Sequence, residues 1–216
     1  MHKSIDNLNL IKEDLKSKIN NYQNVNVIAV SKTFPMEAIM PLIEYGHLEY
    51  GENKVQEAIT KWTEVKLARP NIKLHLIGKL QTNKVKFALK LFDYIHSVDT
   101  KKLAKKIADE ELKQNKKIKI FLQVNIGNEE QKSGINKDYL NEFYLYCKKL
   151  NLDIVGLMCI PPAEAKSEIY FKEMALLTKK LDLKELSMGM SADYIEAAKN
   201  SSTYLRIGSN IFGKRS

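Results

Sequence analysis

Lys32 is the residue in this sequence that is best placed for chemistry. It comes at the end of an apolar run, residues 25–30, that predicts a buried β-strand. An amine at the end of a buried strand loses hydration, which favours its neutral form and lets it attack an aldehyde to form a Schiff base. Lys32 is therefore a candidate nucleophile for a ligand that carries a carbonyl group.

Small and hydroxyl-bearing residues follow two later strand-like runs. Gly208 and Ser209 come directly after the run that contains Arg206, and Ser191 follows another run just ahead of a predicted helix. Phosphate binds where backbone N–H groups at a helix N-terminus allow close approach and nearby hydroxyls donate. A ligand with both an aldehyde and a phosphate fits these residues together with Lys32, and pyridoxal 5′-phosphate (PLP) is such a ligand.

Some of these residues also have an ordinary explanation. Most lysines are solvated surface residues, so Lys32 by itself could be one of them. Ser191 could simply cap the helix predicted at residues 194–200. The phosphate site becomes the better explanation for Ser191 once Gly208 and Ser209 are considered with it.

Length and composition indicate a globular protein of one domain, residues 1–216. The chain is 44% hydrophobic and 28% charged, which is enough apolar content to bury a core. No apolar stretch approaches the roughly 20 residues of a membrane span, and the N-terminus lacks the apolar core of a signal peptide. We therefore expect a cytoplasmic protein without a membrane partner. The two cysteines and four histidines have no spacing typical of a metal site.

The net charge of +9 raises the question of nucleic-acid binding. Only three of the 35 basic residues are arginines, the side chain that reads guanine most often. The lysines are spread along predicted helices, as at Lys101, Lys105 and Lys113, often with acidic neighbours. A solvated helix surface explains this pattern better, so we expect no nucleic-acid partner.

Hydrophobic periodicity predicts an N-terminal helix at residues 5–22 and then eight short strands that alternate with helices. The strands are expected at residues 25–30, 48–50, 73–77, 94–97, 118–124, 154–158, 185–187 and 204–207. The later helices are expected at residues 36–45, 55–67, 84–91, 101–114, 139–150, 167–181 and 194–200. Eight such units predict an α/β fold, a single (β/α)8 TIM barrel, with a doubly wound open sheet as the alternative.

A (β/α)8 barrel places its functional residues at the C-terminal ends of its strands, and phosphate commonly binds the loops after strands seven and eight. Lys32 follows strand one, and the two phosphate-binding loops follow strands seven and eight. The same rule adds Asn53 after strand two, His75 near the end of strand three and Met158 at the end of strand six.

Eight sequence blocks, spread in order over residues 29–213, carry a family resemblance. They are AVSKTFP, YGENKVQEA, HLIGKLQTNK, IHSVD, LQVNIGNEEQKSGI, GLMCIPP, LSMGMSADYIEAA and LRIGSNIFG. In these blocks the chain resembles the pyridoxal phosphate homeostasis protein family, which is related in fold to the N-terminal barrel of alanine racemase.

The resemblance implies a role for each predicted site residue. Lys32 would carry PLP covalently as an internal aldimine, and Arg206 would lie beside the pyridine nitrogen. The other residues would surround the cofactor, with Ser191, Gly208 and Ser209 at the phosphate and Asn53, His75 and Met158 at the ring.

Arg206 bears on whether the protein is an enzyme. Carbanion chemistry on PLP benefits from a protonated pyridine nitrogen, which an arginine disfavours. Racemases of similar fold have a further β-domain that supplies a catalytic tyrosine, and this sequence ends a few residues after strand eight. We therefore expect no catalytic residues and a role in intracellular PLP homeostasis, by buffering or delivery. Apo-PLP enzymes or amino acids are the expected further partners, and a monomer is the expected state.

Three alternatives remain open from the sequence. A PLP-dependent amino-acid racemase of low activity would use the same Lys32. An aldolase-like barrel would use Lys32 with a sugar phosphate. A lysine-rich RNA-binding module would show salt-dependent retention on nucleic acid.

Overall fold

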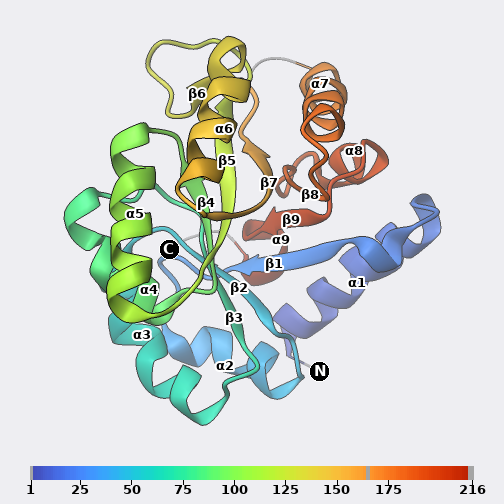
Figure 1. Cartoon of the computed structure of the whole chain (residues 1–216). Helices are drawn as coiled ribbons and strands as arrows, with labels where there is room; N and C mark the ends of the chain where they lie inside the picture. Colours follow the sequence, from blue (N-terminus) through green and yellow to red (C-terminus); the bar gives the residue numbers. More distant parts are fainter. Residues whose placement is uncertain (1, 164–165, 214–216) are drawn as a thin grey trace.

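Eight parallel strands close into a barrel in this structure, a computed structural model that describes residues 2–163 and 166–213 (Figure 1). The strands pair in the order β4-β3-β2-β1-β9-β8-β7-β5, and pairing of β4 with β5 closes the ring. They are β1 (Asn26–Val30), β2 (Glu49–Glu52), β3 (Lys73–Leu76), β4 (Tyr94–Val98), β5 (Lys119–Asn125), β7 (Asp153–Cys159), β8 (Glu185–Ser187) and β9 (Tyr204–Ile207). The predicted (β/α)8 barrel is confirmed, and each predicted strand overlaps one of these.

Helices surround the barrel (Figure 1). They are α1 (Lys3–Lys18), α2 (Met36–Glu44), α3 (Val55–Ala68), α4 (Val85–Leu91), α5 (Lys101–Gln114), α6 (Leu140–Lys149), α7 (Ser167–Lys180), α8 (Tyr194–Lys199) and α9 (Ser209–Phe212). The first helix was predicted to reach residue 22, which is wrong: it ends at Lys18, before Asn20 and Asn21, whose type has low helix propensity. Within the described ranges, no helix is long and apolar enough to cross a membrane.

Three short 3₁₀ turns and one extra strand complete the described secondary structure. The turns are Tyr22–Asn24, Thr82–Lys84 and Lys137–Tyr139. Strand β6 (Ile135–Asn136) has only two residues and pairs with the C-terminal end of β5. Neither β6 nor the four-residue helix α9 was predicted from the sequence.

Apolar side chains fill the barrel on both sides of its strands. The outer faces of the strands pack against the helices, with Trp62, Phe92 and Phe143 among the fully buried side chains. A second cluster lies inside the barrel and consists of Ile28, Val30, Tyr94, Phe121, Met158 and Tyr204. Strands covered on both faces read as continuous apolar runs, which is why they could be predicted from the sequence.

Helix α1 braces the part of the barrel that follows β8 and β9. Its apolar stripe is buried, and it contacts both α8 and α9. The side-chain amide of Asn7 donates to the Ile211 carbonyl of α9 (2.9 Å), and the Tyr194 hydroxyl of α8 donates to Asp14 (2.9 Å). The N-terminal helix therefore helps to position the two segments that the sequence predicts to bind phosphate.

Candidate functional site

Lys32 lies on a tight turn directly after β1. A hydrogen bond from the Phe34 amide to the Ser31 carbonyl (3.1 Å) closes this turn. Thr33 has a φ of 67°, a left-handed conformation that β-branched residues rarely adopt, and its amide donates to the Glu57 carboxylate (2.8 Å). A strained backbone held by a side chain from α3 therefore fixes the base of Lys32, which is itself half-buried.

A buried carboxylate supports this turn from β2. Glu52 is fully buried, and its Oε1 accepts hydrogen bonds from Ser31 Oγ (2.7 Å) and Trp62 Nε1 (3.0 Å). Lys61 of α3 forms an ion pair with the same oxygen (2.7 Å) and donates to the carbonyls of Ser31 and Phe34 (2.9 and 3.1 Å). The sequence analysis left Glu52 and Lys61 out of the site. The signal for Glu52 was a carboxylate at the last position of a buried strand.

Arg206 lies inside the barrel on β9, in register with Ile28 of β1. Its side chain is almost completely buried. The guanidinium donates from Nη1 to Ser187 Oγ of β8 (2.7 Å) and from Nη2 to the Cys159 carbonyl of β7 (2.9 Å). Burial lowers the pKa of Arg206 from its ordinary value, but a guanidinium remains charged in proteins. The barrel interior therefore holds one fixed cation near the C-terminal ends of its strands.

The loops after β8 and β9 are joined to each other. Ser191 Oγ accepts a hydrogen bond from the Asn210 amide (3.4 Å), and Asn210 Nδ2 donates to the Ser191 carbonyl (2.9 Å). Gly208 is the N-cap of α9 and Ser209 its first residue, and the N–H groups of Ile211 and Phe212 donate to the Gly208 carbonyl (both 2.9 Å). Gly208 is half-buried and Ser209 is exposed. These loops supply backbone and hydroxyl donors of the kind that bind phosphate.

Gly189 fixes the path of the loop after β8. Its φ is +87°, and a Cβ at this position would lie 2.4 Å from the Cβ of Ala197 in α8. Its carbonyl accepts a hydrogen bond from the Arg206 amide (3.0 Å). The N-cap of α8 is Asp193 rather than Ser191, so capping of α8 does not explain Ser191.

The Lys32 turn and the loop after β9 come from adjacent strands. Strands β1 and β9 pair in register, with Ala29 opposite Ile207. A Cβ at Gly208 would lie 3.4 Å from the Cβ and from the carbonyl oxygen of Val30, two residues before Lys32. Lys32 and Gly208 therefore follow two neighbouring strand ends that are in contact.

The three other predicted site residues lie in different surroundings. Asn53 follows β2 and is half-buried, and a Cβ at Gly78 would lie only 2.3 Å from its carbonyl oxygen. Met158 is fully buried inside the barrel, in register with Ser187. His75 is also fully buried. Ligand contact by these three residues stays a prediction.

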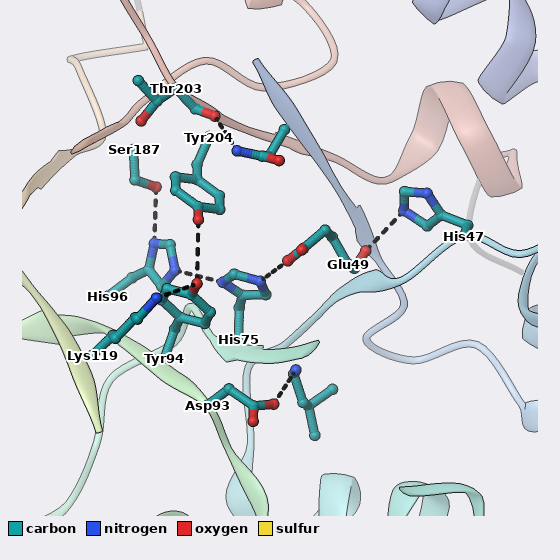
Figure 2. A network of polar contacts seen from close by, with 12 residues as sticks. His47, Glu49, His75, Asp93, Tyr94, His96, Lys119, Ser187, Thr203 and Tyr204 are labelled. Carbon is teal, nitrogen blue, oxygen red and sulfur yellow. Dashed lines mark hydrogen bonds and ion pairs between the residues drawn. The ribbon is translucent and has the colours of Figure 1, made fainter. Parts of the chain in front are cut away.

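His75 belongs to a chain of polar contacts through the barrel interior (Figure 2). Its Nε2 contacts Glu49 Oε2 (2.5 Å), and its Nδ1 contacts His96 Nε2 (2.9 Å). His96 Nδ1 contacts Ser187 Oγ (2.9 Å), the hydroxyl that also binds Arg206. We call these five residues the interior chain. It was not predicted from the sequence, because its members come from five strands.

The two histidines of the interior chain both have a pKa below the ordinary value, which favours the neutral rings. Burial lowers the pKa of His75 and outweighs the opposite effect of Glu49. Burial also holds the pKa of His96 well below its ordinary value, and the nearby His75 and Arg206 lower it further. The chain thus joins a carboxylate to a guanidinium through two uncharged rings.

Known proteins resemble this chain over nearly its whole length. Residues 6–216 match the family described as alanine racemase, N-terminal domain. A pyridoxal phosphate homeostasis protein from Aquifex aeolicus is 38% identical over 199 residues, which cover 88% of this chain and 86% of the relative. A protein of the same name from Haemophilus influenzae is 34% identical over 224 residues, which cover 97% of this chain and 94% of the relative.

Solved structures resemble the fold. PipY of Synechococcus elongatus PCC7942, in a structure with PLP bound, superposes with a TM-score of 0.86 at 32% identity, covering 97% of this chain and 100% of the PipY chain. Alanine racemase from Clostridium difficile 630 superposes with a TM-score of 0.74 at 16% identity, covering 98% of this chain and 56% of the racemase chain. At that identity, the racemase likeness shows the fold alone.

Proposed function

This chain belongs to the pyridoxal phosphate homeostasis protein family, within the wider family of the alanine racemase N-terminal domain, and we propose that it holds PLP as a Schiff base on Lys32. The PLP-bound structure of PipY, at 32% identity, supports this proposal. In the proposed role, the protein buffers or delivers PLP inside the cell and limits the amount of free reactive aldehyde.

One observation carries the proposal: Lys32 and the loop at Gly208 follow adjacent strands that touch at their ends. PLP has its aldehyde and its phosphate-bearing arm on neighbouring carbons of the pyridine ring. An amine and a set of phosphate donors at neighbouring strand ends match that arrangement. Gly208, Ser209 and Ser191 supply donors without bulky side chains, which suits a phosphate.

Arg206 supports a role in binding rather than catalysis. When bound, PLP supplies an electrophilic aldehyde and an electron-withdrawing ring, whose strength as an electron sink depends on protonation of the ring nitrogen. A guanidinium beside that nitrogen disfavours its protonation. Arg206 is held in place by Ser187 and Cys159, which would keep its charge beside the proposed position of the ring nitrogen. We therefore assign no residue a catalytic role and propose transfer of PLP to apoenzymes or amino acids.

The remaining site residues differ in how well their positions suit contact with the ring. Asn53 is half-buried after β2, Met158 is buried in the barrel interior, and both are proposed to line the pocket. Both ring nitrogens of His75 have protein partners. His75 is therefore better suited to act on the site through the interior chain.

Borohydride reduction tests the lysine assignment. Reduction fixes PLP on the lysine that holds it, and digestion with mass spectrometry then finds the labelled peptide. We expect the label at Lys32, its loss in Lys32→Ala, and its retention in Lys54→Ala, which removes an exposed lysine at another strand end. A label on a different lysine would contradict the assignment, and no label at all would contradict covalent binding. Formation of D-alanine from L-alanine that depends on Lys32 would contradict the non-catalytic role.

A further inference from the structure

We propose that the interior chain is a positioning device: it holds Arg206 in one orientation and transmits to it the charge of Glu49 at the opposite end of the barrel. Glu49 is the first residue of β2, and its side chain is 23% exposed. Arg206 lies near the C-terminal end of β9. The inference rests on the proposed function in one respect, since Arg206 is proposed to face the ring nitrogen of PLP.

The hydrogen bonds of the first half of the chain have one permitted direction. An ionised carboxylate only accepts hydrogen bonds, so Nε2 of His75 must donate to Glu49. A neutral imidazole has one donor and one acceptor, which leaves Nδ1 of His75 as an acceptor. Nε2 of His96 therefore donates to Nδ1 of His75. Both rings are then Nε2–H tautomers.

The second half of the chain continues in the same direction. Nδ1 of His96 is left as an acceptor, so it receives the hydroxyl proton of Ser187. Ser187 Oγ in turn accepts from Arg206, whose guanidinium only donates. Every bond thus runs from the cation to the carboxylate, and bonds aligned in this way polarise one another.

Packing against aromatic rings holds the two imidazole rings in the orientation that these hydrogen bonds require. The ring of His75 stacks on Tyr94 (centroids 4.3 Å apart, 12° between planes), and that of His96 stacks on Phe121 (4.2 Å, 21°). Tyr204 contacts both imidazole rings. Both histidines are fully buried, so breaking a link would leave a polar atom unpaired in an apolar interior.

Charge on Glu49 is what selects the direction. A neutral group at that position can donate to His75, which would reverse the tautomers of both rings. His96 would then donate to Ser187, and Ser187 Oγ would have to accept from His96 and Arg206 while its own proton found another acceptor. Loss of the Glu49 charge therefore changes the hydrogen bond between Arg206 and Ser187, although Glu49 and Arg206 lie at opposite ends of the interior chain.

The charged groups around the chain come from several strands and helices. Near His75 these are Glu49 of β2, Asp93, which directly precedes β4, and Lys66 of α3. Near the two tyrosines that flank the rings, Lys119 of β5 donates to Tyr94 (3.3 Å) and Glu185 of β8 acts on Tyr204. Glu185 lies at the same end of the barrel as Glu49 but outside the chain, so it provides a matched control.

The first test uses the protein without PLP, so it does not depend on the proposed function. In nitrogen-15 NMR spectra near neutral pH, both rings should be Nε2–H tautomers. Glu49→Gln should change the ring nitrogen shifts of His96, which Glu49 does not touch, and Glu185→Gln should leave them unchanged. An Nδ1–H tautomer on either ring of the wild type, or equal His96 shifts in the wild type and Glu49→Gln, would overturn the proposal.

The second test concerns the link from the chain to PLP. Ser187→Ala removes the hydroxyl that Arg206 donates to, and a hydrogen bond to a charged group corresponds to a loss of roughly tenfold in affinity. We expect weaker PLP binding with the borohydride label still on Lys32, and partial rescue in Ser187→Thr, which retains a hydroxyl. Unchanged affinity in Ser187→Ala would contradict the coupling. Absence of PLP binding in the wild type would contradict the proposed function instead.

Discussion

The two ends of the barrel differ in the origin of their polar groups. At the C-terminal end, the strand side chains Glu52 and Arg206 are joined by groups from loops: the Lys32 turn and the segments around Ser191 and Gly208, where backbone donors and small residues prevail. At the N-terminal end, the polar groups are the first side chains of strands, and they bond to one another. There Tyr94 accepts hydrogen bonds from Lys119 (3.3 Å) and Tyr204 (3.4 Å). Loop donors suit ligand binding, whereas paired strand side chains suit stability.

The interior chain connects these two ends. Its Glu49 terminus belongs to the N-terminal end of the barrel, and its Arg206 terminus lies near the proposed PLP pocket. A cavity of about 280 Å³ at the N-terminal end is lined by the tyrosines on which His75 packs. The contrast between the ends can be tested with substitutions at each end whose effects on PLP binding and on stability are measured separately.

Lys32→Ala should have the largest effect and should affect binding alone. The variant should lose the absorption of the imine completely, because the nucleophile is gone. A half-buried side chain on a turn adds little packing, so we expect its free energy of unfolding to stay within roughly 0.5 kcal/mol of the wild type. Absorption after addition of PLP and chemical denaturation measure the two quantities. Imine absorption that remains in Lys32→Ala would contradict covalent PLP binding at the C-terminal end of the barrel.

Lys61→Met should destabilise the support behind the Lys32 turn. Lys61 is 13% exposed and pairs with the fully buried Glu52, so its removal leaves a buried charge unpaired, at a cost of about 3–5 kcal/mol. Lys101→Met is the matched control, because Lys101 and Glu142 are paired on the surface, where such pairs contribute about 0–1 kcal/mol. Denaturant titration compares the variants. Equal losses would show that the carboxylate is not held as described.

Lowering the pH should destabilise the N-terminal end through His47. Burial lowers the pKa of His47 to about 4, and its Nε2 contacts the Glu49 carbonyl (2.9 Å). As the pH falls from about 6.5 to about 4, the unfolded chain binds a proton that the folded protein does not. The free energy of unfolding therefore falls through this range, by up to about 3 kcal/mol from this residue.

His47→Gln should make this pH dependence weaker without removing it. Glutamine keeps a donor for the Glu49 carbonyl but does not titrate. His75 and His96 are also buried with lowered pKa values, so they keep part of the slope. Thermal unfolding between pH 4 and 7 measures the difference. The same pH dependence of stability in the wild type and the variant would show that His47 does not contribute to it.

Gly189→Ala and Gly208→Ala should differ in stability, because Gly189 has no room for a side chain in the proposed phosphate-binding loops and Gly208 has. Alanine at position 189 would require a φ of +87° and would meet Ala197, at a cost of about 1–3 kcal/mol. At position 208 the nearest atoms would lie 3.4 Å away in Val30, an ordinary contact distance. Gly208→Ala should therefore fold with nearly wild-type stability. Equal destabilisation of both variants would contradict the described loop path.

Most of the fold could be predicted from the sequence, because strands buried on both faces alternate with amphipathic helices. All eight barrel strands were expected within a few residues of their positions. Strand β6 was missed because two half-buried residues have no periodicity to detect. That residues 1–216 form a single domain stays a prediction, and residues 1, 164–165 and 214–216 lie outside the described ranges.

The positions of the proposed site could be predicted, but the contacts behind it could not. The strand-end rule located Lys32, Ser191 and Gly208 because it depends only on where strands stop. The interior chain depends on barrel closure, which brings His96 within hydrogen-bonding distance of Ser187, 91 residues later. Local patterns carry no information on such a pair.

The most direct test of the account is an absorption spectrum of the purified protein before and after addition of PLP, repeated with Lys32→Ala. We predict a visible imine band that saturates at one PLP for each chain in the wild type and is absent from the variant. A wild-type protein that stays colourless in excess PLP, or a variant that develops the same band, would contradict PLP binding through Lys32.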